Sequence, residues 1–199
     1  NGRMGSLVWI NNKLHQSKLK LQINRVDVFG SISYSAIHEL HTDYCGACGF
    51  VEIAFNSEPF LPGMTMQHLS IYDALMTASG KDFKVRVLVH NQLDIMAIEI
   101  DDSRDNPADI DIDLKMIRPN KVQTGKHLAV SELLTGDRAL ILNQEFTEPS
   151  GSTVMKGDHY CASSVAVRVI GRESKALDLN HSNSRFKVKG SNGKFTILI

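Results

Sequence analysis

Apolar and polar residues alternate with a period of two along much of this chain, and this pattern restricts the fold more than any other feature. It is clear at Leu19, Leu21 and Ile23, which alternate with Lys20 and Gln22. Successive side chains of a β-strand point to opposite faces of its sheet, so the run predicts a strand with one buried face. The same alternation predicts strands at residues 51–55, 85–89, 96–100, 110–116, 165–169, 186–188 and 195–199.

Turn-forming residues separate these runs. Residues 79–82 and 101–107 contain the Ser, Gly, Asp, Asn and Pro residues that favour turns. Asn192-Gly193 lies between the last two runs and is a strong hairpin signal. The best helical candidate, residues 127–134, is too short to support an α/β fold. We therefore expect an all-β fold, a large antiparallel β-sandwich or supersandwich built from consecutive hairpins.

The pattern contains no repeat and no low-complexity linker, so one domain is expected over residues 1–199, with residues 147–158 as its surface loop. The chain opens on Asn1-Gly2-Arg3 directly before an apolar segment, and it closes on the alternating run at residues 195–199. Natural termini usually fray into polar residues. We therefore expect this domain to be a fragment of a longer protein.

Charge and hydropathy exclude several classes of partner. The chain has 22 basic and 22 acidic residues in 199, so no nucleic-acid partner is expected. No apolar stretch approaches the roughly 18 residues needed to cross a bilayer, so no membrane partner is expected either. The P-loop, G-x-G-x-x-G and G-x-S-x-G motifs are all missing from the sequence.

Cysteine supplies the sharpest chemical motif, Cys45-Gly46-Ala47-Cys48. Three interpretations are open. The two cysteines are small residues at the start of a strand, they form a short disulfide, or they bind zinc together with His159 and Cys161. One CxxC lacks the second pair that makes a zinc site specific, so we predict no metal and no cofactor.

Acidic residues raise the possibility of a glycosidase centre in this segment. A general acid and a base would have to come from a set scattered over separate predicted strands and turns: Asp27, Asp43, Asp73, Asp94, Glu99, Asp101 and Asp102. A solvated carboxylate is the ordinary outcome in such places. We therefore predict no catalytic residue.

The opening motif resembles a known family. Residues 1–9, NGRMGSLVW, followed by residues 21–29, LQINRVDVF, are similar to the start of the N-terminal β domain of clan-L-type glycoside hydrolases. The inverting α-L-fucosidases of glycoside hydrolase family ninety-five are the named group that it most resembles, and Phe29 stands where they usually have Trp. Residues 43–53, 69–74 and 94–102 look more like an uncharacterised bacterial branch that carries the same domain.

The resemblance implies a place in a larger enzyme. In such hydrolases a β-supersandwich precedes an (α/α)6 barrel that holds the catalytic carboxylate. The chain would then be a non-catalytic domain that packs on this barrel and shapes its active site. Carbohydrate and the catalytic domain are the implied partners, and an exported, periplasmic or extracellular enzyme is expected.

By the same resemblance, Asn1, Arg3, Asn24 and Asp27 are the candidate substrate-binding residues. Their side chains offer the donors and acceptors that sugar hydroxyls require. Two other interpretations remain open. These residues brace a turn and a strand end, or the chain is a stand-alone carbohydrate-binding or structural module that binds glycans through aromatics such as Trp9 or Tyr160.

Overall fold

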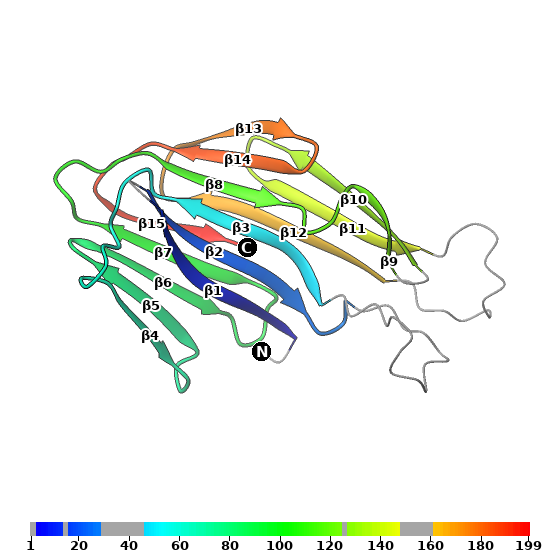
Figure 1. Ribbon diagram of the computed structural model, residues 1–199, viewed down its shortest axis with the longest axis horizontal. Helices are drawn as coiled ribbons and strands as arrows, with labels where there is room; N and C mark the ends of the chain where they lie inside the picture. Colours follow the sequence, from blue (N-terminus) through cyan, green and yellow to red (C-terminus); the bar gives the residue numbers. More distant parts are fainter. Residues whose placement is uncertain (1–2, 14–15, 29–45, 125–126, 148–160) are drawn as a thin grey trace.

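The computed structural model describes residues 3–13, 16–28, 46–124, 127–147 and 161–199. Within these residues every regular element is a β-strand, and the strands form two antiparallel sheets packed face to face (Figure 1). The predicted all-β sandwich is thus confirmed.

The two sheets differ in size. The six-stranded sheet has, in spatial order, the strands β1 (Met4–Lys13), β2 (Gln16–Arg25), β3 (Ala47–Ala54), β8 (Ile110–Lys115), β14 (Asn183–Val188) and β13 (Ser174–Asn180). The nine-stranded sheet has the order β4 (Met66–Ser70), β5 (Leu75–Gly80), β6 (Phe83–Val89), β7 (Met96–Asp102), β15 (Gly193–Leu198), β12 (Cys161–Ile170), β11 (Leu140–Thr147), β10 (His127–Thr135) and β9 (Lys121–Thr124). In Figure 1, β4 and β5 extend beyond β1 at the lower left.

Burial alternates along the strands with the same period of two as the apolar residues in the sequence. On β2, Leu19, Leu21 and Ile23 are at most 2% exposed, while the residues between them are half-buried. Strand β7 repeats this arrangement with Met96, Ile98 and Ile100. These inward-facing rows from both sheets form one apolar core.

All eight predicted strands are present, with ends shifted by one or a few residues, as β2, β3, β6, β7, β8, β12, β14 and β15. The helical candidate is wrong, because residues 127–134 belong to β10. There Ala129 and Ser131 are buried, Val130 and Glu132 are exposed, and both edges of β10 are paired, to β9 and β11.

The Asn192-Gly193 hairpin is also wrong. Strands β14 and β15 do not pair with each other, since β14 pairs with β8 and β13 while β15 pairs with β7 and β12. Gly193 takes a positive φ of 100°, and the turn carries the chain from one sheet to the other. Similar crossings after β3, β7, β8 and β12 interrupt the expected series of consecutive hairpins, which is present in the runs β1–β3, β4–β7, β9–β12 and β13–β14. The predicted surface loop at residues 147–158 lies outside the described residues except for Thr147, which ends β11.

Candidate functional site

A cavity of about 330 Å³ opens between the two sheets at the end of the sandwich where β1 begins and β2 ends. Its walls come from both sheets, and they carry no aromatic side chain. The lining residues are Met4, Ile23, Arg25, Cys48, Asp94, Ile95, Ser164, Val165, Ala166, Arg168, Leu198 and Ile199.

One wall of this cavity is a strand with a free edge. Strand β12 pairs with β11 through residues 161–167, but on its other side only residues 168–170 pair with β15. Among the described residues no strand covers the rest of that side. Ser164, Val165 and Ala166 of this stretch line the cavity, so backbone hydrogen-bonding groups border an apolar space.

An arginine at the rim of the cavity joins the two sheets. Arg25, the last residue of β2, shares the inward-facing side of that strand with Ile23, because the two are separated by two positions. Its Nη1 donates to Oδ2 of Asp94 at 2.6 Å, and Asp94 lies in the loop between β6 and β7 of the other sheet. Its Nε and Nη2 donate to Oδ1 and Oδ2 of Asp27 at 2.7 and 2.5 Å.

These contacts fix the charge state of the site. Hydrogen bonds to Asp27 and Asp94 raise the pKa of Arg25. The hydrogen bond from Arg25 lowers the pKa of Asp27, which is therefore ionised at neutral pH. A glycosidase general acid needs the opposite, a raised pKa that keeps its proton. Asp27 thus suits a structural or binding role.

Two of the four predicted residues meet at this ion-pair cluster. Asp27 binds Arg25, and the Nε of Arg3 lies 3.8 Å from Oδ1 of Asp94. Asn24 does not join them, because its Oδ1 accepts from Nε2 of Gln22 on the face of β2 opposite to Arg25. Asn1 lies outside the described residues.

Sequence reasoning missed the residue that organises the cluster. Arg25 lies between the two predicted positions Asn24 and Asp27, yet nothing in its local pattern distinguishes it from a solvated cation. Asp94 was weighed only as a general acid. Its pairing spans 69 residues of chain and depends on how the two sheets stack.

The other candidate acids do not converge. Asp73 accepts from Ser70, Glu99 pairs with Arg86, and Asp102 pairs with Arg104. Asp101 has only a long contact with Lys194, at 3.6 Å. Asp43 lies outside the described residues.

The cysteine motif is only partly described. Cys48 is a buried free thiol and Cys161 begins β12, while Cys45 and His159 lie outside the described residues. Burial raises the pKa of the Cys48 thiol, which disfavours the thiolate that zinc requires. Within the described part of the chain, no three His, Cys, Asp or Glu residues are grouped as metal ligands.

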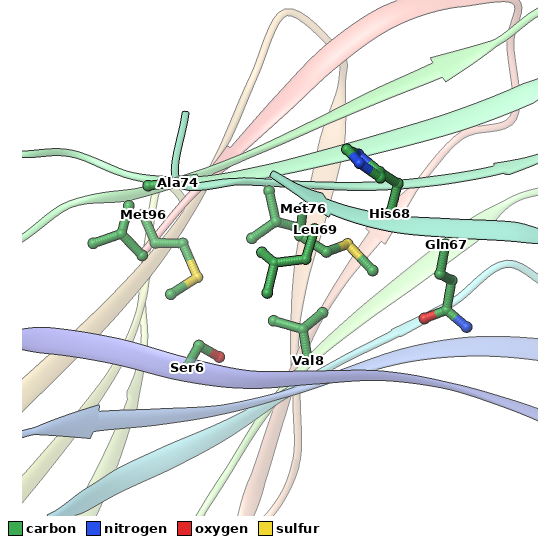
Figure 2. Close-up of a pocket in the computed structure, with 10 residues that line it drawn as sticks. Ser6, Val8, Gln67, His68, Leu69, Ala74, Met76 and Met96 are labelled. Carbon is green, nitrogen blue, oxygen red and sulfur yellow. The ribbon is translucent and has the colours of Figure 1, made fainter. Parts of the chain in front are cut away.

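A second cavity, of about 360 Å³, lies between β1 and the overhanging strands β4 and β5. Figure 2 shows Leu69 and Met76 directed toward Val8 of β1, with Met96 beside Ser6. Its polar lining is limited to Ser6, Gln67 and His68. This cavity extends the apolar interior and carries no charged group.

Comparison with known proteins does not assign a family. No protein-family model matches the chain, and a search of curated proteins finds no match either. No helix that is long and apolar enough to cross a membrane occurs in the described part of the chain.

Proposed function

We propose that the chain is the non-catalytic N-terminal β domain of a bacterial glycoside hydrolase, related to the α-L-fucosidases, and that it packs against further polypeptide of that enzyme. The observation that carries the packing role is the free edge of β12 above the apolar cavity. The sugar chemistry of the parent enzyme rests on the resemblance of the opening motif alone.

The composition of the cavity supports a polypeptide neighbour over a bound sugar. Sugar sites combine an aromatic platform with several hydroxyl-binding groups. This lining has polar members, Arg25, Asp94, Ser164 and Arg168, but its other residues are apolar and none is aromatic. Unpaired strand edges next to apolar surface are the usual template for pairing with another segment. The ion pairs of Arg25 at the rim then supply polar contacts around an apolar centre, as in interfaces between domains.

Hydrogen exchange tests the packing role. In the full-length protein we expect those amides of residues 162–166 that point away from β11 to exchange at least about tenfold more slowly than in a protein ending at Ile199, because a strand or loop would cover them. The amides of β8 serve as the control, since β8 is paired on both sides and should be protected equally in both proteins. Equal exchange of residues 162–166 in both proteins would contradict the packing role.

Hydrolysis tests the enzymatic part of the proposal. We expect the full-length protein to hydrolyse an α-linked glycoside and the 199-residue segment to be inactive. A reading frame that stops at Ile199 would exclude the accessory-domain function. The same resemblance leads us to propose that the parent enzyme is exported, which a signal peptide in the full reading frame would support.

A stand-alone carbohydrate-binding module is the second candidate, and Trp9 is the observation that favours it. Its side chain is 37% exposed on the outer face of β1, where it is free to stack on a sugar ring. Trp9 is also the only tryptophan in the sequence, so its fluorescence reports directly on ligand binding. Glycan titrations that change this fluorescence, and that lose affinity in Trp9→Ala, would favour the module. Tyr160, the other aromatic considered, lies outside the described residues.

A further inference from the structure

The far end of the sandwich carries a group of cations that the ion-pair cluster of Arg25 does not involve. Strands β2 and β14 run in opposite directions, so Lys187 and Lys189 at the end of β14 lie at the end opposite to Arg25. Two hollows of about 370 and 320 Å³ adjoin there, with Glu173 and Lys189 lining both. We call this region the basic end, and its cations are Arg172, Lys175, Lys187, Lys189 and Lys194.

Two lysines of the basic end face each other without a counter-ion. Lys175 of β13 lies directly opposite Lys187 of β14 in the antiparallel register. Like charges in directly opposed positions destabilise a sheet. Among the described residues, no carboxylate lies within 4 Å of the amino group of either lysine, or of Lys189, which follows on the same face.

The middle of the same sheet shows the ordinary arrangement. There Glu52 accepts from Lys20 and Lys115, and Asp113 accepts from Arg185. Every cation of that row has a carboxylate partner within 3.0 Å. The direct opposition of Lys175 and Lys187, with no carboxylate partner, departs from this arrangement.

Few carboxylates lie near the basic end, and most of these already interact with another group. Oδ1 of Asp109 accepts from the backbone N–H of Gly190 at 2.9 Å, and Asp101 lies 3.6 Å from Lys194. Asp111, directly opposite Lys187 on β8, accepts from Nη1 of Arg185 at 3.0 Å. Glu173 is left to balance the three lysines that have no ion pair. The two hollows are lined by five cations and by only two carboxylates, Asp109 and Glu173, so the positive charge is in local excess.

Arg172 adds a rigid cation to this surface. Its Nη2 donates to the carbonyl oxygens of Asn192 and Gly193 at 3.2 and 3.1 Å, and its guanidinium lies 4.5 Å from the centre of the Phe195 ring. Its Nη1 is buried and has no hydrogen-bond partner. Burial lowers the pKa of Arg172, so a nearby anion would stabilise its charge.

We infer that the basic end binds an oxyanion, the carboxylate or sulfate group of an acidic saccharide, between Lys175, Lys187 and Lys189 with Arg172 behind them. Charge-assisted hydrogen bonds from several lysines to one oxyanion would relieve the opposition of Lys175 and Lys187. The saccharide nature of the ligand rests on the proposed function, whereas the oxyanion site rests on the charges described above.

The test is a titration of the full-length protein with a uronic-acid oligosaccharide, a neutral oligosaccharide of equal length and inorganic sulfate. We expect the uronate to bind, and K175Q/K187Q to weaken its binding at least about tenfold. The matched control K18Q/K84Q removes the same charge elsewhere, from residues without an ion pair, and should change the affinity less than about twofold. Added NaCl should weaken the binding further.

Three results would overturn the inference. The neutral oligosaccharide binds as tightly as the uronate, the control variant loses as much affinity as K175Q/K187Q, or an acidic peptide of equal charge binds as well. Sulfate binding without uronate binding would exclude the saccharide ligand. None of these results bears on hydrogen exchange at residues 162–166, so the two proposals fail separately.

Discussion

At the scale of single residues, Asp102 is the most deeply buried charged residue in the described part of the chain. It ends β7, is fully buried, and accepts hydrogen bonds from Nε and Nη2 of Arg104 at 2.8 and 2.6 Å. Arg104 in turn donates to Oγ of Ser57 at 2.6 Å and stacks on Phe83. We expect Asp102→Asn to lower the free energy of unfolding by about 3 kcal/mol, because it leaves a buried guanidinium without its counter-ion.

Urea unfolding at neutral pH measures this effect. The control is Asp101→Asn, one residue earlier, whose carboxylate contacts only an exposed lysine at 3.6 Å. That change should stay within about 0.5 kcal/mol. Equal effects of the two substitutions would mean that Arg104 finds another partner.

Gly80 marks a close approach between two backbones. A Cβ added there would lie 1.8 Å from the carbonyl oxygen of Pro59. We expect Gly80→Ala to cost about 3 kcal/mol of stability, since backbone rather than a flexible side chain must move. Gly5→Ala, on β1 with no heavy atom within 4 Å of the added Cβ, should fold normally. Thermal unfolding of the two variants measures this, and equal midpoints would contradict the prediction.

Some residues of the candidate site could be predicted from the sequence and others could not. Asp27 and Arg3 were recognisable because they belong to the opening motif. Arg25 gains its role only when β2 is stacked against the loop that carries Asp94. A contact between two sheets does not change the alternation of residues along a strand, so no local sequence pattern could predict it.

At the scale of elements, a row of charges crosses the outer face of the six-stranded sheet. Burial raises the pKa of Glu52 on β3, but hydrogen bonds from Lys115 and Lys20 outweigh it, and the pKa is lowered in the folded protein. A carboxyl group with a lowered pKa stabilises the fold above its unfolded pKa and loses this effect as the pH falls through the folded value.

We therefore expect Glu52→Gln to lower the free energy of unfolding by about 1 kcal/mol at pH 7. The difference from the wild type should begin to shrink below the unfolded pKa of about 4.3 and should vanish below the lower folded pKa, where Glu52 is protonated in both states. Urea unfolding at a series of pH values measures this. Lys115→Met should shrink the pH dependence of the wild type, and a difference that grows in acid would contradict the explanation.

The sequence predicted several strands in which one face is buried and the other is exposed to solvent. Strands β2, β6 and β7 alternate cleanly and were predicted. Strand β4 was not, because four of its five residues are exposed and its pattern carries no burial signal. Strand β10 was assigned to a helix, because its run of Leu, Ala and Val has no strict alternation in sequence although burial alternates in the structure.

At the scale of the whole molecule, β15 holds the nine-stranded sheet together. It is the only strand that joins β7 to β12, and so it links two four-stranded halves in the described part of the chain. We expect Ile197→Pro to abolish cooperative unfolding, because proline removes a ladder donor in a central strand whose side chain is fully buried. Circular dichroism during urea unfolding measures this.

The matched control is Leu69→Pro on the edge strand β4, where one side of the backbone has no partner in the described residues. This variant should keep a cooperative transition with a modest loss of stability. Cooperative unfolding of Ile197→Pro would show that the two halves hold together through the other sheet.

The position of β15 also determines when the protein can fold during synthesis. It is the last of the described strands in chain order, yet it occupies the middle of its sheet. While the ribosome is still making the chain, the two halves of that sheet expose edges that nothing yet joins. The nine-stranded sheet can therefore be completed only after β15 has left the exit tunnel, and a chain that stalls before this point leaves those strand edges open to pairing with other chains.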